Sequence, residues 1–203
     1  MTSRVNKIAI NDLNSADEPF IYQTEIKDLL IIKRPHFPDS RGSFQELYRT
    51  PDIEKLIGRE VKLKQGALAE SDPNVLKGIH AEPQDKVIIP LTGKLIAVIV
   101  DLRVDSKTFK DYIMVDFDIS DEAPTRASLF IPKGCGNSYY VYKKSRRVFY
   151  QYAVSETYDP STREMGVRFD DGQLNISWPE NNPILSERDK NMPSLSEFLE
   201  RFR

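Results

Sequence analysis

Short apolar runs of β type dominate the sequence from residue 29 onward. They are roughly four to eight residues long and recur about every ten residues, with turn-forming residues between them. This spacing favours an antiparallel β-sandwich or barrel over a chain of alternating strands and helices. We expect strands at residues 29–32, 61–65, 87–91, 94–101, 112–117, 126–131, 138–142 and 147–154, with a hairpin turn at 91–94.

Two short helices are expected at the periphery of this β structure. Thr50 can cap the first helix, Pro51 stands where proline is best tolerated, and Gly58 can end it. Ser194 and Glu197 have the spacing of a capping box in front of a C-terminal helix. The fold class is therefore mainly β, with short helices outside the sheets.

The domain organisation is expected to be simple. Residues 1–25 are polar without a clear period and predict an N-terminal extension, whereas residues 26–203 predict a single domain that ends in the C-terminal helix. A chain of 203 residues fits one sandwich or barrel. The segment 178–193 lacks a regular pattern but keeps apolar residues, so it is expected to pack on the barrel.

Charge and cysteine content exclude several classes of function. The 29 basic and 31 acidic residues nearly cancel, so no bulk field favours nucleic acid or an anionic membrane. The apolar stretch 95–100 is too short to cross a bilayer, and the N-terminus lacks the apolar core of a signal peptide. Cys135 is the only cysteine, which excludes an internal disulfide and indicates a reducing compartment. We expect a cytoplasmic protein in which Cys135 serves packing rather than catalysis.

A histidine and a tyrosine are candidates for proton transfer. His80 is one of two histidines in the chain, and its imidazole can take a proton near neutral pH. A hydrogen-bonded structural histidine is an equally good interpretation. Tyr150 and Tyr152 fall on one face of the strand at 147–154, where the phenol of Tyr150 could donate a proton or could pack in the core.

Charged residues elsewhere in the chain could complete such a site. Asp189 and Lys86 would by themselves be interpreted as solvated surface charges. Arg41, Lys77, Lys86 and Arg188 could converge on a diphosphate, although their spread along the chain leaves this open. An imidazole, a phenol and a carboxylate in one barrel suggest proton transfer at a carbon atom.

A metal site is the main alternative for a histidine in a β-barrel. Zinc or iron would need about three His, Cys or carboxylate ligands at suitable spacing. Two residues after His80 only Glu82 is available, and the segment 132–137 presents Asn137 rather than a histidine. We therefore expect no metal ion.

Several short motifs, in this order, resemble those of a known enzyme family. They are 37–42 (FPDSRG), 75–80 (VLKGIH), 100–103 (VDLR), 131–134 (IPKG), 158–160 (YDP), 169–171 (FDD), 177–179 (SWP) and 184–189 (ILSERD). Over residues 29–193 the chain resembles the dTDP-4-dehydrorhamnose 3,5-epimerases, which act on nucleotide-linked 4-keto sugars. The resemblance implies a cupin jelly-roll barrel, a homodimer with strands exchanged between subunits, and neither a metal nor a nicotinamide cofactor.

The resemblance also implies roles for individual residues. By position, His80 matches the general base, Asp189 the carboxylate that orients it, Tyr150 the general acid, and Lys86 the cation beside the C4 oxygen. The positions that match the substrate cleft are Arg41, Glu46, Gln65, Lys77, Asn137 and Arg188. Phe37 matches an aromatic residue that packs near the base and is expected to come from the partner subunit.

Four positions depart from the family pattern. Asn137 replaces a histidine, Ala67 an asparagine, and Thr157 an aromatic residue that commonly stacks on the thymine. Lys77 replaces an arginine and gives up a planar, bidentate phosphate contact. The proton-transfer residues match while the recognition residues differ, so the reaction is implied more firmly than the nucleotide or the sugar.

The resemblance therefore predicts an epimerase that inverts C3, C5 or both in a nucleotide-linked 4-keto sugar. Two alternatives stay open. One is a sugar-nucleotide-binding cupin without activity, although a binding protein needs neither a base nor an acid. The other is a nucleotide-sugar 3,4-ketoisomerase, which typically presents a pair of histidines in the barrel, where this chain presents His80.

Overall fold

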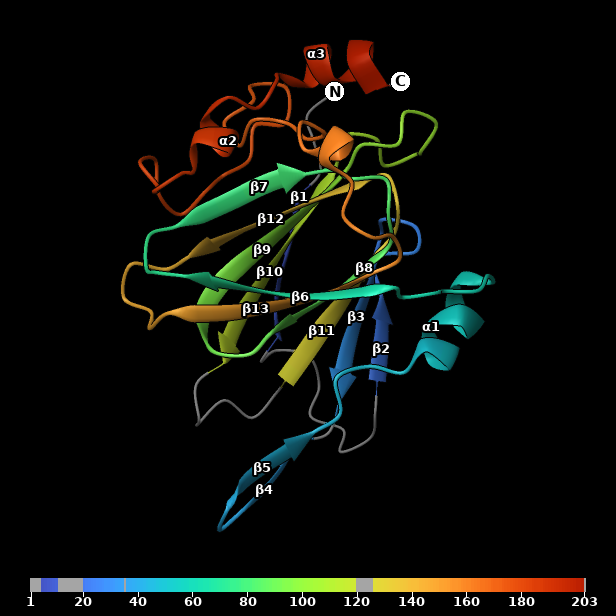
Figure 1. Ribbon diagram of the computed structural model, residues 1–203, viewed down its shortest axis with the longest axis vertical. Coiled ribbons are helices and arrows are strands. Elements are labelled where there is room, and N and C mark those ends of the chain that lie inside the picture. The colour runs from blue at the N-terminus through green and yellow to red at the C-terminus, as the bar shows by residue number, and fades with distance from the viewer. Residues whose placement is uncertain (1–4, 11–19, 35, 120–125, 203) are drawn as a thin grey trace.

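The computed structural model of the protein describes residues 5–10, 20–34, 36–119 and 126–202. The described strands form a five-stranded and a six-stranded sheet that face each other, and a two-stranded hairpin extends away from them (Figure 1). The five-stranded sheet contains, in spatial order, β1 (Val5–Ala9), β10 (Tyr112–Ile119), β9 (Gly93–Asp101), β12 (Cys135–Val141) and β7 (Leu76–His80). The six-stranded sheet contains β2 (Phe20–Gln23), β3 (Leu30–Arg34), β11 (Arg126–Ile131), β8 (Lys86–Pro90), β13 (Val148–Val154) and β6 (Gln65–Ser71). The hairpin consists of β4 (His36–Asp39) and β5 (Gly42–Gln45).

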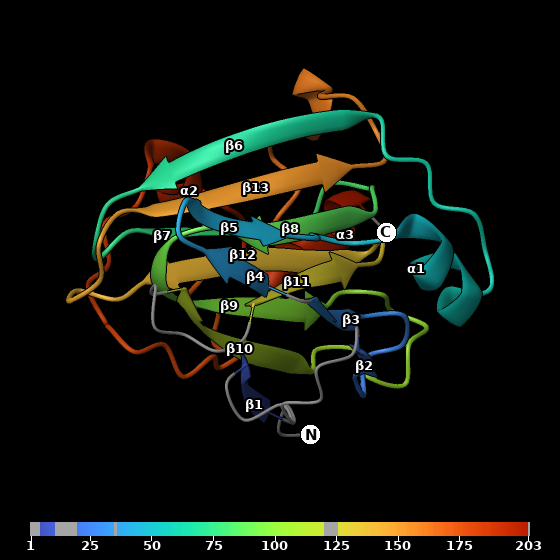
Figure 2. The same ribbon diagram turned by 90° about the horizontal axis from the view of Figure 1, so that it is seen from below.

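Apolar side chains fill the space between the two sheets and also cover their outer faces. Ile31, Ile88, Ile99 and Leu129 belong to the cluster between the sheets. The C-terminal segments 167–178 and 195–202 pack on the outside of the five-stranded sheet, and α1 (Thr50–Ile57) packs on the six-stranded sheet. Because both faces are covered, the central strands are buried along almost their whole length and are mainly apolar instead of strictly alternating. The view from below shows the two layers and α1 at their side (Figure 2).

Seven of the eight expected strands correspond to β3 and to the strands from β8 to β13. The exception is the expected strand at 61–65, because β6 begins only at Gln65. Val61 and Leu63 instead pack with Ile53 of α1, so this apolar run covers the sheet from outside. The expected hairpin turn at 91–94 is also wrong, because β8 and β9 lie in different sheets and the turn joins the two layers.

The helices follow their terminal signals with one correction. Helix α1 ends at Gly58, whose φ of 73° is a left-handed conformation that glycine adopts without strain. Its N-cap is Arg49 rather than Thr50, and no side chain caps it. Helix α3 (Leu195–Phe202) begins with the expected capping box, since the Ser194 amide donates to Glu197 Oε2 and the Glu197 amide to Ser194 Oγ. Two further short helices, η2 (Pro160–Thr162) and α2 (Glu187–Lys190), lie in the C-terminal part of the chain.

The segment expected as an N-terminal extension takes part in both sheets. Strand β1 pairs in parallel with β10, and β2 pairs antiparallel with β3, so each is an edge strand. The C-terminal tail packs on the barrel as expected, with Trp178 and Leu185 against the outer cluster. Within the described ranges, no helix is long and apolar enough to cross a membrane.

Candidate active site

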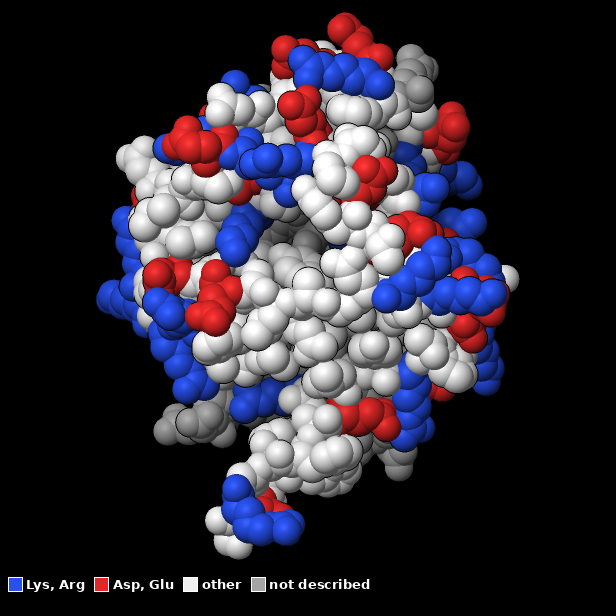
Figure 3. All heavy atoms as spheres, in the orientation of Figure 1, with Lys and Arg blue, Asp and Glu red and all other residues white. Residues whose placement is uncertain are grey.

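A cavity of about 450 Å³ opens at one end of the barrel, within the size range of small-molecule sites. Strands β6, β7, β8, β12 and β13 contribute to its wall, and so does the segment that follows β13. Its polar and aromatic lining residues are Gln65, His80, Glu82, Gln84, Lys86, Asn137, Tyr152, Glu156, Thr157, Tyr158, Asp159 and Thr162. Figure 3 shows a recess on this face, with a mainly uncharged centre and charged side chains around it.

A second hollow, of about 620 Å³, is wider but chemically less specific. It lies against β9, β10 and β12, and two of its three lysines are paired with carboxylates, Lys94 with Asp118 and Lys143 with Glu180. Among the described residues that line it there is no histidine. We therefore consider the cavity that contains His80 the functional site.

His80 and Asp189 form a hydrogen-bonded dyad at this cavity. His80 Nε2 lies 2.6 Å from Asp189 Oδ1, and Ser186 Oγ donates to the other carboxylate oxygen at 2.8 Å. Burial by itself raises the pKa of Asp189, but the hydrogen bond from His80 and that from Ser186 outweigh it and lower this pKa below its ordinary value. The ionised carboxylate holds the Nε2 proton, which leaves Nδ1 of the neutral ring as the basic nitrogen.

Local structure fixes the carboxylate of this dyad. Ser186 is the N-cap of α2, and its hydroxyl also accepts a hydrogen bond from the Asp189 amide. The side chain of Asp189 is only 3% exposed, so water competes little for its oxygens. The capping interaction therefore positions the residue that in turn orients His80.

Lys86 lies beside the dyad within a network of charges. Its ammonium donates to Glu82 Oε2 at 2.7 Å, and Arg188 Nη2 donates to Glu82 Oε1 at 3.1 Å. Burial by itself raises the pKa of Glu82, but Lys86, His80 and Arg188 together lower it to about 2. Glu82 is therefore ionised and holds two cations next to the cavity.

Tyr150, which the resemblance implies as the general acid, lies in the core and not in the described cavity wall. Its side chain is fully buried, its ring stacks on that of Tyr139 with centroids 4.2 Å apart, and its hydroxyl donates to Asn137 Oδ1. Tyr152 lines the cavity instead, two residues further along the same face of β13. Alternation correctly places both phenols inside the barrel, but it does not tell which of them reaches the open end.

Burial also determines the protonation of Tyr152. It raises the pKa of this phenol well above its ordinary value, and Tyr139, Tyr150 and Glu82 shift it in the same direction. Tyr152 therefore carries its proton at neutral pH. It is the one phenol in the described cavity wall that also lies inside the barrel, since Tyr158 is largely exposed.

The structure places Gln65 and Asn137 in the cavity wall and the other expected substrate residues outside it. Arg188 donates to Glu82, which lines the cavity. Lys77 Nζ, on β7, donates to the carbonyl oxygen of Glu70 on β6 of the other sheet. Burial lowers the pKa of Lys77, with Asp189 opposing the shift. Neither of these two cations belongs to the described cavity wall.

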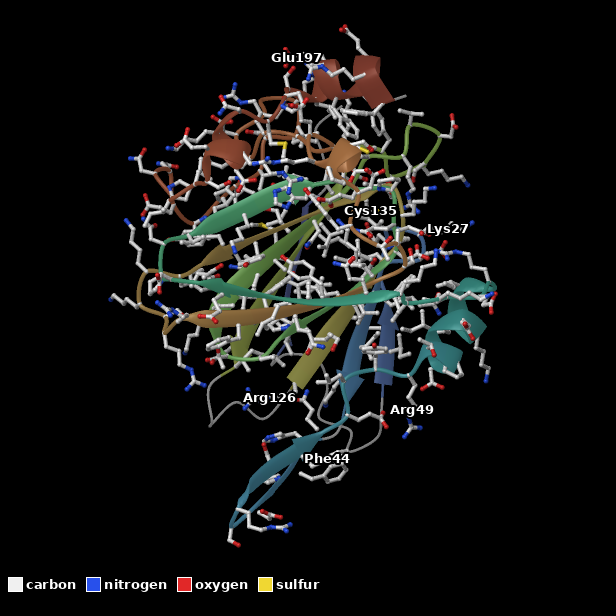
Figure 4. The ribbon with its side chains drawn as sticks, in the orientation of Figure 1. Lys27, Phe44, Arg49, Arg126, Cys135 and Glu197 are labelled. Carbon is white, nitrogen blue, oxygen red and sulfur yellow. The ribbon has the colours of Figure 1, made fainter. Side chains whose placement is uncertain are left out.

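The hairpin and the segment after it lie away from this cavity. Phe37 is 58% exposed and stacks on Phe44, and Arg41 at the tip pairs with Asp39 at 2.6 Å. Glu46, which follows the hairpin, accepts a hydrogen bond from Arg49. Figure 4 shows Phe44 on the hairpin, apart from the barrel, and Cys135 inside it. Within one chain, these residues do not contribute to the cavity wall.

Sequence reasoning missed Tyr152 and Glu82 as site residues. The available signal for Tyr152 was its shared face with Tyr150, and for Glu82 its position two residues after His80. For metals, the described residues contain no group of three or more His, Cys, Asp or Glu side chains arranged to hold an ion. Burial raises the pKa of Cys135 to about 12, which fits a packing role for this thiol.

Comparison with known proteins assigns the chain to a family. The model of the dTDP-4-dehydrorhamnose 3,5-epimerases matches residues 23–197. The chain belongs to this epimerase family. The dTDP-4-dehydrorhamnose 3,5-epimerase of Shigella flexneri is 31% identical over 175 residues, which cover 84% of this chain and 93% of that protein.

Solved structures of epimerases have the same jelly-roll architecture. A 4-keto-6-deoxy sugar epimerase from the novobiocin gene cluster of Streptomyces spheroides has a TM-score of 0.82 and 29% identity, covering 93% of each chain. The epimerase of Legionella pneumophila, solved in complex with dTDP-4-keto-L-rhamnose, has a TM-score of 0.79 and 30% identity, covering 88% of this chain and 94% of that one. The fold is thus the cupin-like barrel of the epimerases.

The charge network of this epimerase predicts a specific pH dependence of stability. Because the pKa of Glu82 is depressed, its contribution is fully present above its ordinary pKa of 4.5 and is lost as pH falls toward about 2. Wild type should exceed Glu82→Gln by about 3 kcal/mol in free energy of unfolding at pH 7, with the difference shrinking below pH 4.5. Urea denaturation at pH 7, 4 and 3 measures this, and a difference that does not change with pH would contradict the network.

Proposed function

We propose that the protein inverts C3, C5 or both of a dTDP-linked 4-keto-6-deoxy sugar without a cofactor. The observation that carries the proposal is that His80, which is hydrogen-bonded to Asp189, and the phenol of Tyr152 line one cavity. A base with its orienting carboxylate and a protonated acid are the groups that this reaction needs. Membership of the epimerase family supports the same reaction.

Proton abstraction in this mechanism begins at the imidazole. A ketone at C4 acidifies the hydrogens on C3 and C5, because the carbanion is delocalised as an enolate. Nδ1 of His80 takes such a proton, and Asp189 stabilises the imidazolium that forms. Lys86, with one ammonium proton left after its bonds to Glu82 and the His80 carbonyl, offsets charge on the enolate oxygen. Such electrostatic stabilisation contributes on the order of 3 kcal/mol.

Reprotonation from the opposite side of the sugar ring completes the inversion. Tyr152 donates its proton to the carbon from which His80 removed one, and the enolate returns to the ketone. The raised pKa of the phenol keeps the proton available at neutral pH. This assignment moves the role of general acid from Tyr150 to Tyr152.

We also propose that the protein acts as a homodimer in the cytoplasm. The hairpin β4–β5 extends from the barrel and exposes Phe37 and Phe44 by 58% and 68%, an aromatic pair that a second subunit could cover. A hairpin exchanged with a partner would bring Phe37 and Arg41 to the partner's cavity. The unpaired Cys135 fits a reducing compartment.

The dimer can be tested by mass in solution. Light scattering after size exclusion should give twice the chain mass for wild type and one chain mass for the double variant Phe37→Ser, Phe44→Ser, because the exposed aromatic pair is lost. A wild-type protein of one chain mass at micromolar concentration would contradict the dimer.

The reaction itself is tested in deuterated water. With dTDP-4-keto-6-deoxyglucose as substrate, NMR should show deuterium uptake at C3, at C5 or at both, together with inversion at the same carbon. Which carbon exchanges decides between single and double inversion. Absence of exchange at both carbons, with bound nucleotide sugar, would leave a binding protein instead of an enzyme.

A further inference from the structure

We propose that Tyr150 is a positioning residue, which orients the amide of Asn137 so that its Nδ2 donates to an oxygen of the bound sugar. The inference rests on the proposed function, because it assigns a sugar contact within the same cavity. The buried phenol of Tyr150 then has a role other than that of general acid. Asn137 Nδ2 is the donor, and it favours a substrate with an acceptor oxygen at this point.

The phenol reaches across the barrel to make this contact. Tyr150 lies on β13 in the six-stranded sheet and Asn137 on β12 in the five-stranded sheet, and Tyr150 Oη lies 3.3 Å from Asn137 Oδ1. The ring of Tyr139 stacks on that of Tyr150 at an interplanar angle of 18°, and Tyr139 Oη is in turn 2.8 Å from Ser71 Oγ. The phenol is therefore held in place by packing before any substrate binds.

The buried hydroxyl determines which way the amide points. Tyr150 is 0% exposed, so its proton cannot be donated to water, and Asn137 Oδ1 is the acceptor that the structure provides. With the amide reversed, Nδ2 would donate to the phenol oxygen, and the phenol proton would have no acceptor. An unsatisfied buried donor costs about 1–3 kcal/mol, which disfavours the reversed amide.

The orientation leaves Asn137 Nδ2 facing the cavity. Asn137 belongs to the cavity wall, and the described residues provide no hydrogen-bond acceptor for Nδ2. Asn137 also pairs with His80 across the neighbouring strands β12 and β7. A donor that does not titrate therefore lies next to the base, where an oxygen on the sugar would lie close to the carbon that loses its proton.

Binding of the sugar tests the orientation of the Asn137 side-chain amide directly. Isothermal titration with dTDP-glucose and with dTDP separates the sugar contact from the nucleotide contact. Asn137→Ala should weaken dTDP-glucose on the order of tenfold, the value of one hydrogen bond, and leave dTDP unchanged. Asn137→Asp should weaken dTDP-glucose at least as much, because a carboxylate oxygen replaces the donor. Full affinity in Asn137→Asp would overturn the proposal, since it would mean that an oxygen faces the sugar.

The role of Tyr150 is tested by a double-mutant cycle, which measures how Tyr150 and Asn137 together affect the affinity for dTDP-glucose. Tyr150→Phe should weaken dTDP-glucose several-fold in the wild-type background and have no further effect in Asn137→Ala. An equal effect in both backgrounds would mean a merely structural role and would overturn the proposal. Tyr140→Phe is the control, because this phenol lies on β12, the strand of Asn137, but donates to Asn74 Oδ1, and neither residue lines the cavity. These experiments measure the affinity for dTDP-glucose and do not depend on deuterium exchange. Failure of the proposed roles of Tyr150 and Asn137 can therefore be distinguished from failure of the proposed reaction.

Discussion

Replacing His80 with alanine is expected to abolish deuterium uptake at both C3 and C5 and to lower kcat by roughly 10³-fold. The imidazole is the basic group that the dyad holds toward the cavity, and Asp189 cannot replace it because its side chain lies behind the ring and is 3% exposed. NMR of the substrate in deuterated water measures exchange and inversion in the same sample.

Binding provides the control for this variant. His80→Ala should retain the affinity of wild type for dTDP, since the nucleotide does not contact the imidazole in the proposed mechanism. A variant that binds normally and still epimerises would show that another group removes the proton. The same pair of measurements separates an enzyme from a sugar-nucleotide-binding cupin, which would have no activity to lose.

Replacing Tyr152 with phenylalanine should separate exchange from inversion. His80 remains and can remove a proton and return a deuteron on the same face, so uptake of deuterium should persist at a reduced rate. Inversion should fall by about 10²-fold or more, because no acid serves the opposite face. NMR that follows the configuration of the product together with its deuterium content gives both quantities.

Tyr150→Phe is the matched comparison for Tyr152→Phe. It removes a hydroxyl from the same strand and the same face, yet it should keep inversion, with its main effect on binding of the sugar. If inversion is lost in Tyr150→Phe and kept in Tyr152→Phe, Tyr150 and not Tyr152 is the general acid. Because the pKa of Tyr152 is raised, the alkaline loss of inversion in wild type should occur above pH 10.

Much of the fold can be predicted from local patterns because local physics determines it. Gly58 and the Ser194–Glu197 box predict helix ends, and most strands follow from apolar runs between turns. The apolar run at 61–65 could not be resolved in this way, because packing against α1 and pairing in a sheet bury the same kinds of side chain. Likewise, a turn such as 91–94 can close a hairpin or join two sheets. Only the strands with which β8 and β9 pair show which of the two it does.

The site shows the same division between local and long-range information. His80 and Asp189 lie in the motifs and Lys86 is named by its position in the resemblance, but the choice between Tyr150 and Tyr152 depends on depth within the barrel. That depth follows from strand register, which a single sequence does not specify. The pairing of Glu82 with Arg188 likewise joins segments that are distant in sequence, whereas Lys86 lies only four residues after Glu82.

The position of the sugar ring tests the central claim most directly. In a crystal structure with bound dTDP-glucose, we expect the ring to lie between His80 Nδ1 and Tyr152 Oη, with one atom on each face of the ring and both within hydrogen-bonding reach of C3 or C5 substituents. A ring bound with both groups on one face, or bound outside the cavity that His80 lines, would contradict the account.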